Sequence, residues 1–259
     1  MRRPLMKSGF RERQTMNNII EELRQCFPKT GIGYEFFTQL NQTLEGQHGF
    51  TPDNTRFAEG ACCDEINEPE LLLLEKHWGE RFKFGGLAGY CHGGRTGLGA
   101  VSHHVPEEGG QKNLLLVAGP HIGWHDGEWG KVPREGQAEI TTSCGALMAI
   151  MGAGHDNLEA KALDPLDAQQ FNVERIMLPF LKVADDVGDV PLIALATQFL
   201  MQRVDTDLGT IIDGLLPHFE GQIACVTGVT INTAKGNFFC PSTQVIHNHQ
   251  KSGGTLALD

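Results

Sequence analysis

The segment 113–118 contains four consecutive large apolar residues, Leu114-Leu115-Leu116-Val117. A strand with one face in water alternates apolar and polar residues, whereas a strand of a parallel sheet covered on both faces is apolar throughout. This run therefore predicts a buried strand of a parallel sheet, which is the strongest constraint that the sequence places on the fold.

The rest of the chain alternates between strand-like and helix-like segments. Strands are predicted over 55–61, 82–87, 223–231 and 243–247, and helices over 71–77, 144–151, 167–183 and 192–216. This alternation predicts an α/β fold with a mostly parallel central sheet covered by helices on both faces. We expect residues 1–16 to be a disordered tail, 17–54 to be an N-terminal helical segment or layer, and 55–250 to be the α/β domain that carries the function.

Charge and cysteine content narrow the classes of partner and compartment. The net charge of -11 argues against nucleic acid or an anionic membrane surface as a partner. No apolar run approaches the 18 residues of a membrane-spanning helix, and the basic N-terminal residues lack the apolar stretch of a secretory signal. The seven cysteines are odd in number and two are adjacent, which disfavours a framework of disulfides. We therefore expect a reducing compartment, by default the cytoplasm.

Three separated residues are candidates for one metal site. Cys62 ends a predicted strand, His121 follows the apolar strand through Gly119-Pro120, and Cys144 begins a predicted helix for which Ser143 is a candidate N-cap. At the start of a helix, unpaired N–H groups lower the pKa of a thiol and favour the thiolate that metals bind. Two thiolates and one imidazole would hold zinc with a fourth coordination position open, as in catalytic sites.

The spacing of these residues does not decide between a metal site and a structural role. Cysteine often packs as a small apolar side chain, and a single histidine is more often a hydrogen-bonded structural residue than a ligand. The roles of Cys63, His103 and His104 stay open, although adjacent residues on an extended segment cannot both face the same site. The glycine-rich stretch 85–99 lacks the GxGxxG pattern of a dinucleotide-binding loop.

Short blocks around these positions resemble one family in the expected order. They are CDEIN (63–67), GGLAG (85–89), HHVPEEGG (103–110), GPHIG (119–123), GKVPREGQ (130–137) and SCGA (143–146). The resemblance is to the low-CO2-inducible LCIB family of β-type carbonic anhydrases and covers roughly residues 34–250. It implies a β-carbonic-anhydrase-like fold, a homodimer, and zinc held by Cys62, His121 and Cys144, with Asp64 as the catalytic aspartate.

The activity that this resemblance implies is the reversible hydration of CO2 to bicarbonate and a proton. The alternative is a catalytically silent zinc protein that binds inorganic carbon or a partner in a CO2-concentrating system. The two hypotheses share every ligand and differ in whether the fourth zinc position is open. A zinc hydrolase acting on another carbonyl compound would need a group to protonate a leaving group, and the sequence offers no clear candidate.

One position departs from the pattern of ordinary β-class enzymes, which place an arginine two residues after the aspartate. This chain has Ile66 there. Another arginine must then hold the Asp64 carboxylate ionised and aimed. We predict Arg95, in the loop GGRTG, as that partner and Arg134 as the second choice, while Arg95 as an ordinary surface cation stays open. If the arginine withdrew, Asp64 could ligate zinc itself and give an inactive form.

Overall fold

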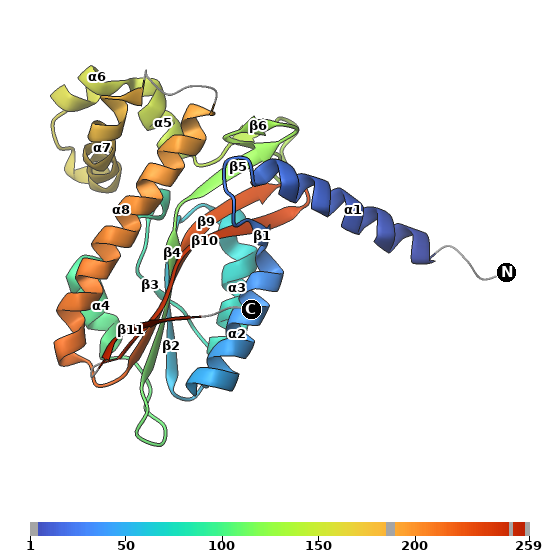
Figure 1. Cartoon of the computed structure of the whole chain (residues 1–259). Helices are drawn as coiled ribbons and strands as arrows, with labels where there is room; N and C mark the ends of the chain where they lie inside the picture. The colour runs from blue at the N-terminus through green and yellow to red at the C-terminus, as the bar shows by residue number, and fades with distance from the viewer. Residues whose placement is uncertain (1–4, 185–189, 249–250, 257–259) are drawn as a thin grey trace.

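A nine-stranded sheet forms the centre of the computed structural model, which describes residues 5–184, 190–248 and 251–256 (Figure 1). Its main strand order is β1-β10-β9-β4-β2-β3. The strands of this path are β1 (Gly31–Ile32), β2 (Thr55–Ala61), β3 (Phe82–Lys83), β4 (Asn113–Gly119), β9 (Gln222–Thr233) and β10 (Gly236–Asn248). The remaining strands of the sheet are β5 (His121–His125), β6 (Glu128–Trp129) and β11 (Lys251–Thr255).

The strands nearest the candidate residues run parallel. Strand β2 pairs in parallel with β3 and β4, and β4 pairs in parallel with the first half of β9. Strand β5 continues beside the second half of β9, also in parallel, with His121 opposite Thr230. Strands β10, β1 and β11 add an antiparallel margin. The prediction of a mostly parallel sheet is therefore confirmed.

The apolar run of β4 is explained by burial on both of its faces. Leu114 and Leu116 pack in one core cluster with α4 (Gly94–Ser102) and α8 (Leu192–Leu215), whereas Leu115 and Val117 pack in a second cluster with α2 (Gly33–His48) and α3 (Glu68–Trp78). Figure 1 shows these two pairs of helices on opposite sides of the sheet. Successive side chains of a strand point to opposite faces, so a doubly covered strand must be apolar at every position.

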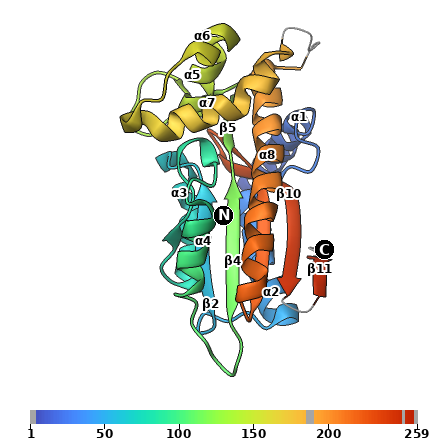
Figure 2. The ribbon, with the colours of Figure 1, turned by 90° about the vertical axis from the view of Figure 1, so that its left-hand side faces the viewer.

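A third group of helices lies beyond the carboxyl end of β4 (Figure 2). It consists of α5 (Gly145–Ala153), α6 (His155–Ala160) and α7 (Ala168–Leu181), which pack on the first half of α8. Cys62 and Cys144 belong to the apolar cluster of this group. The edge of the sheet at which parallel strands end is therefore covered, and the candidate ligands lie beneath the cover.

Several elements differ from the sequence predictions. Helix α1 spans Leu5–Leu23, whereas the sequence predicted a tail without regular structure over residues 1–16; Met16, Ile19 and Ile20 of this helix pack on the core. Helix α4 occupies part of the stretch predicted as a glycine-rich loop, because Leu98 and Val101 give it a fully buried apolar face. The sheet also begins before residue 55, with β1. Among the described helices, none combines the length and apolar composition that crossing a membrane requires.

Gly119 marks the break between β4 and β5. Its φ is 146°, and a Cβ at this position would lie 1.9 Å from the carbonyl oxygen of Gly228 on β9. A side chain would therefore push β4 away from β9. The close approach lets the chain turn through Pro120 and resume beside β9, with His121 as the first residue of β5.

A buried ion pair supports β2 on the way to the site. Glu59 is 6% exposed, and Nε of Arg81 lies 3.4 Å from its carboxylate. Arg81 also contacts Glu68 at 2.6 Å and Glu75 at 3.5 Å. Burial raises the pKa of Glu59, and the Arg81 guanidinium limits that rise.

Replacing Arg81 with methionine should destabilise the protein by about 3 kcal/mol at pH 7, because it leaves the buried Glu59 carboxylate without its ion-pair partner. A carboxyl group whose pKa is raised on folding loses stabilising effect as pH rises above its unfolded pKa of about 4.3. The variant raises this pKa further, so its deficit should be small near pH 4 and large at pH 7. Urea unfolding at both pH values measures it. Arg56→Met is the control, because Arg56 donates to the carbonyl oxygens of His104 and Glu80. A deficit equal at both pH values would contradict the explanation.

Candidate metal centre

The structure brings the three predicted ligands together. The sulfur atoms of Cys62 and Cys144 and a ring nitrogen of His121 all lie within 4.8 Å of one another. The three residues are 4%, 3% and 1% exposed. Cys62 directly follows β2 and His121 begins β5, so the shared edge of the parallel sheet places both, and the start of α5 supplies Cys144.

The donor atoms fit a metal ion. Nδ1 of His121 lies 2.7 Å from Oδ1 of Asn232 and 3.0 Å from Oγ of Ser143. The other ring nitrogen, Nε2, is buried and has no hydrogen-bond partner among the described residues. A buried polar atom without a partner is costly unless something binds it. One imidazole nitrogen and two sulfurs form the donor set that zinc and similar ions favour, so this group of residues could hold a metal ion.

The two cysteines differ in acidity. The sulfur of Cys144 beside it, together with burial, raises the pKa of the Cys62 thiol well above its usual value. The neighbouring Cys62 lowers the pKa of Cys144; burial opposes this, and the backbone N–H groups of Leu147 and Ala146 assist it. These N–H groups belong to the first turn of α5, as the sequence predicted, but the N-cap is Cys144 and not Ser143. Cys144 is therefore the first of the two to supply a thiolate.

Asp64 lies beside the three ligands without joining them. Its Oδ2 is 3.7 Å from Nε2 of His121. The guanidinium of Arg134 donates two parallel hydrogen bonds to the carboxylate, from Nη1 to Oδ1 at 2.6 Å and from Nη2 to Oδ2 at 2.7 Å. Burial acts to raise the pKa of Asp64, but the Arg134 guanidinium and nearby His121 outweigh it and the pKa is lowered. The carboxylate is thus held ionised and fixed in direction.

The predicted partner Arg95 is wrong, and the second choice, Arg134, is the residue that pairs with Asp64. Arg95 is exposed in the first turn of α4, beside Gly214 of α8. Arg134 lies between β7 (Lys131–Val132) and β8 (Thr141–Thr142), which form a two-stranded sheet of their own. Its Nε donates to Oγ1 of Thr141 at 3.0 Å, and Nη1 also contacts Glu65 at 2.6 Å.

The residues whose roles the sequence left open lie outside the centre. Cys63 is exposed and does not belong to the ligand group. His103 and His104 are both exposed after the end of α4. The carbonyl oxygen of His104 accepts a hydrogen bond from Arg56, which lies near the start of β2, whereas Cys62 follows the end of that strand. Neither histidine therefore faces the ligands.

Sequence reasoning missed the residues that support His121. Asn232 is fully buried in β9, and Ser143 is fully buried immediately before Cys144. A signal for Asn232 was its place directly after the predicted strand 223–231, where a buried amide needs buried partners. The sequence does not show which partners it has.

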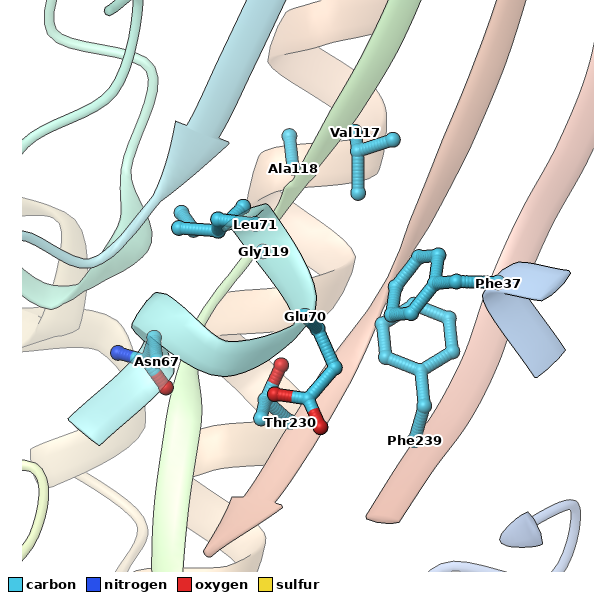
Figure 3. A pocket seen from close by; sticks show the side chains of 11 residues that line it. Phe37, Asn67, Glu70, Leu71, Val117, Ala118, Gly119, Thr230 and Phe239 are labelled. Carbon is cyan, nitrogen blue, oxygen red and sulfur yellow. The ribbon is translucent and has the colours of Figure 1, made fainter. Parts of the chain in front are cut away.

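Two cavities flank η1 (Glu65–Asn67), the turn that follows Asp64. A small one of about 20 Å³, room for about one water molecule, is mostly apolar but includes Asn67, Glu70 and Thr230 (Figure 3). Figure 3 shows Asn67 and Glu70 at the start of the helical segment, with Thr230 on the neighbouring strand. A larger, open one of about 400 Å³ has Arg134 in its wall together with Glu65, Glu135, Gln137 and Asn237.

Comparisons with known proteins agree with this geometry. Residues 32–248 match the profile of the family described as limiting CO2-inducible proteins B/C β-carbonic anhydrases. The crystal structure of PtLCIB4, a homolog of the limiting CO2-inducible protein LCIB, is similar with 29% identity and a TM-score of 0.81, over 91% of this chain and 98% of that one. The crystal structure of LCIB itself gives 26% identity and a TM-score of 0.66, over 91% and 98%. A search of curated protein sequences found no match.

Proposed function

This chain belongs to the limiting CO2-inducible protein B/C family of β-carbonic anhydrases, and we propose that it catalyses the reversible hydration of CO2 to bicarbonate and a proton. Cys62, His121 and Cys144 would hold the zinc ion. The observation that supports the proposal is the Asp64–Arg134 pair beside the three ligands. Arg134 binds both oxygens of the Asp64 carboxylate, so the carboxylate does not take the fourth position at the metal.

Zinc, when bound, would supply the Lewis acid that activates a water molecule for attack on CO2. The remaining work belongs to the side chains. Oδ2 of Asp64 lies 3.7 Å from Nε2 of His121. It would accept a hydrogen bond from the attacking water and so orient the lone pair of that water toward CO2. Arg134 holds both carboxylate oxygens, so Asp64 stays ionised and does not turn toward the ligands.

The surroundings of the pair suit this reaction. Helices α5 and α7 cover the sulfur ligands and exclude bulk water from them. The open cavity of about 400 Å³ reaches Arg134 and Glu65, so solvent contacts the outer side of the Asp64–Arg134 pair. We propose that the released proton leaves by this side, where the exposed carboxylate of Glu65 contacts Nη1 of Arg134.

The test is a stopped-flow assay of CO2 hydration on reduced protein whose zinc content is measured in the same sample. We expect about one zinc ion per chain, the stoichiometry of one three-ligand site, together with hydration activity. Zinc without hydration would favour the silent zinc protein that the sequence left as the alternative. Absence of zinc from every preparation would contradict both functions.

The homodimer and the cytoplasmic location stay predictions from the sequence. The measured mass of the protein in solution tests the first, and the location of the tagged full-length chain in its own cell tests the second.

A further inference from the structure

The proton position on His121 decides whether the centre can form. A neutral imidazole carries one N–H and one lone pair, and a metal binds only the nitrogen with the lone pair. Nε2 faces the sulfurs, so the proton must lie on Nδ1, next to Asn232 and Ser143. The hydroxyl of Ser143 can donate or accept, so the proton position depends on which end of the Asn232 amide faces the ring.

The hydrogen bonds of Asn67 help to determine the orientation of the Asn232 amide. Nδ2 of Asn67 donates to the carbonyl oxygens of Cys62 at 3.3 Å and Asp64 at 3.2 Å. Backbone carbonyl oxygens only accept hydrogen bonds, so the NH2 end of Asn67 must face them. Its Oδ1 therefore faces Asn232, 3.3 Å from Nδ2 of that residue.

The contacts of Asn237 indicate the same orientation of the Asn232 amide. Nδ2 of Asn237 donates to the carbonyl oxygen of Ile66 at 3.0 Å and to Oε2 of Glu70 at 2.6 Å. The Ile66 carbonyl again accepts only, so Oδ1 of Asn237 is turned toward Asn232, 3.0 Å from its Nδ2. Two oxygens thus flank one end of the Asn232 amide, and that end must be the NH2 group.

We propose that Asn232 is a positioning residue that holds His121 as the neutral tautomer with its proton on Nδ1. With its NH2 group between two oxygens, Asn232 presents Oδ1 to the ring and can only accept the Nδ1 proton. Oδ1 has a second lone pair, which accepts from Ser143 Oγ at 3.2 Å. Nε2 is left with its lone pair toward the sulfurs of Cys62 and Cys144.

The direction of this network originates in the backbone carbonyls of Cys62, Asp64 and Ile66. The segment that carries one thiol ligand and the catalytic carboxylate therefore also sets the tautomer of the histidine ligand. Asn67 and Asn232 are 3% and 0% exposed, and the small cavity beside Asn67 has room for only about one water molecule, so bulk water does not compete for the amides of Asn67 and Asn232 (Figure 3). The inference uses the metal site of the proposed function and does not depend on the reaction.

The proton position is measured directly by nitrogen NMR of the full-length, metal-stripped chain labelled with ¹⁵N-histidine, with the His121 signal assigned by its loss in His121→Ala. We expect the neutral ring to carry its proton on Nδ1. Asn232→Leu, which removes the acceptor, should move the proton wholly or partly to Nε2. Asn232→Asp keeps an acceptor and should keep the proton on Nδ1.

The same variants should separate in zinc affinity, measured by competition with a chelator. Loss of an outer-shell partner of a ligand costs about 10- to 100-fold in metal affinity, and we expect this loss for Asn232→Leu and a smaller one for Asn232→Asp. The matched control is Asn41→Leu, because Asn41 is also a buried asparagine but bonds Trp78 in a distant cluster. It should leave both the proton position and zinc affinity unchanged.

A neutral His121 ring with its proton on Nε2 in the unmutated, metal-free protein would overturn the proposal without any variant; the spectra are recorded at a pH high enough for the ring to be neutral, because the imidazolium carries a proton on both nitrogens. So would an Asn232→Leu protein with the native proton position and native zinc affinity. If that variant does not fold, a proton on Nδ1 in the native chain and in Asn232→Asp supports the proposal, and a shift in the aspartate variant contradicts it. Absence of CO2 hydration with the expected proton position would overturn the proposed function alone.

Discussion

Arg134→Ala should lower the rate of CO2 hydration by about 100-fold or more, while Arg95→Ala leaves the rate unchanged. Arg134 makes two short hydrogen bonds to Asp64 and lowers the pKa of that carboxyl. Without it, the half-buried carboxylate loses its cation and the bonds that set its direction. Asp64 is then free to turn toward the metal ligands, 3.7 Å away at Nε2 of His121.

Zinc content distinguishes this explanation from a general loss of structure. Arg134 contacts no ligand side chain in the described structure, so the alanine variant should keep its zinc and lose its rate. Arg95→Ala is the matched control, because the same side chain is removed from an exposed position on α4. Equal rates for the two variants would show that the Asp64–Arg134 pair has no part in catalysis.

Cys144→Ser should abolish stable zinc binding, and with it CO2 hydration. The change replaces the more acidic of the two thiols by a hydroxyl that does not ionise near neutral pH, so the centre loses its first thiolate. Only one sulfur and one imidazole remain. We expect affinity to fall by more than about 100-fold, the upper end of the effect of an outer-shell change.

The chain offers a close control for this variant in Cys63→Ser. Cys63 is adjacent to Cys62, but it is exposed and does not belong to the ligand group. Metal analysis and chelator competition should find native zinc in the Cys63 variant and almost none in the Cys144 variant. Full zinc content in Cys144→Ser would remove Cys144 from the ligand set.

The sheet was predictable because burial is recorded in the sequence. The apolar run of β4 predicted a strand covered on both faces, and the predicted bounds of β2 coincide with those observed. The sequence predictions fail where the contacts of only a few residues determine whether a helix forms. Glycines concealed α4, whose stability comes from Leu98 and Val101 packing against α8. In α1, by contrast, Ile19 and Ile20 lie in the N-terminal segment that the sequence did predict as helical.

The sequence predicted the site residues that directly follow strands, but it did not predict which loop residue contacts them. Cys62 and His121 share an edge because their strands are parallel neighbours through β4 and β9. Arg134 reaches Asp64 across 70 residues of sequence, by way of a short hairpin whose path no periodic pattern records. Asn232 likewise meets His121 only because β9 lies beside β5.

The position of β9 also determines when the centre can form during synthesis. This strand comes from the last part of the chain, yet it lies in the middle of the sheet and supplies the amide that contacts His121. When Cys62, His121 and Cys144 have left the ribosome, the strand that supports the histidine has not yet been made. Bringing such distant segments together carries a high entropic cost and slows folding. The nascent chain should therefore acquire zinc late, after residue 237 has emerged, and a truncated product should be unable to retain it.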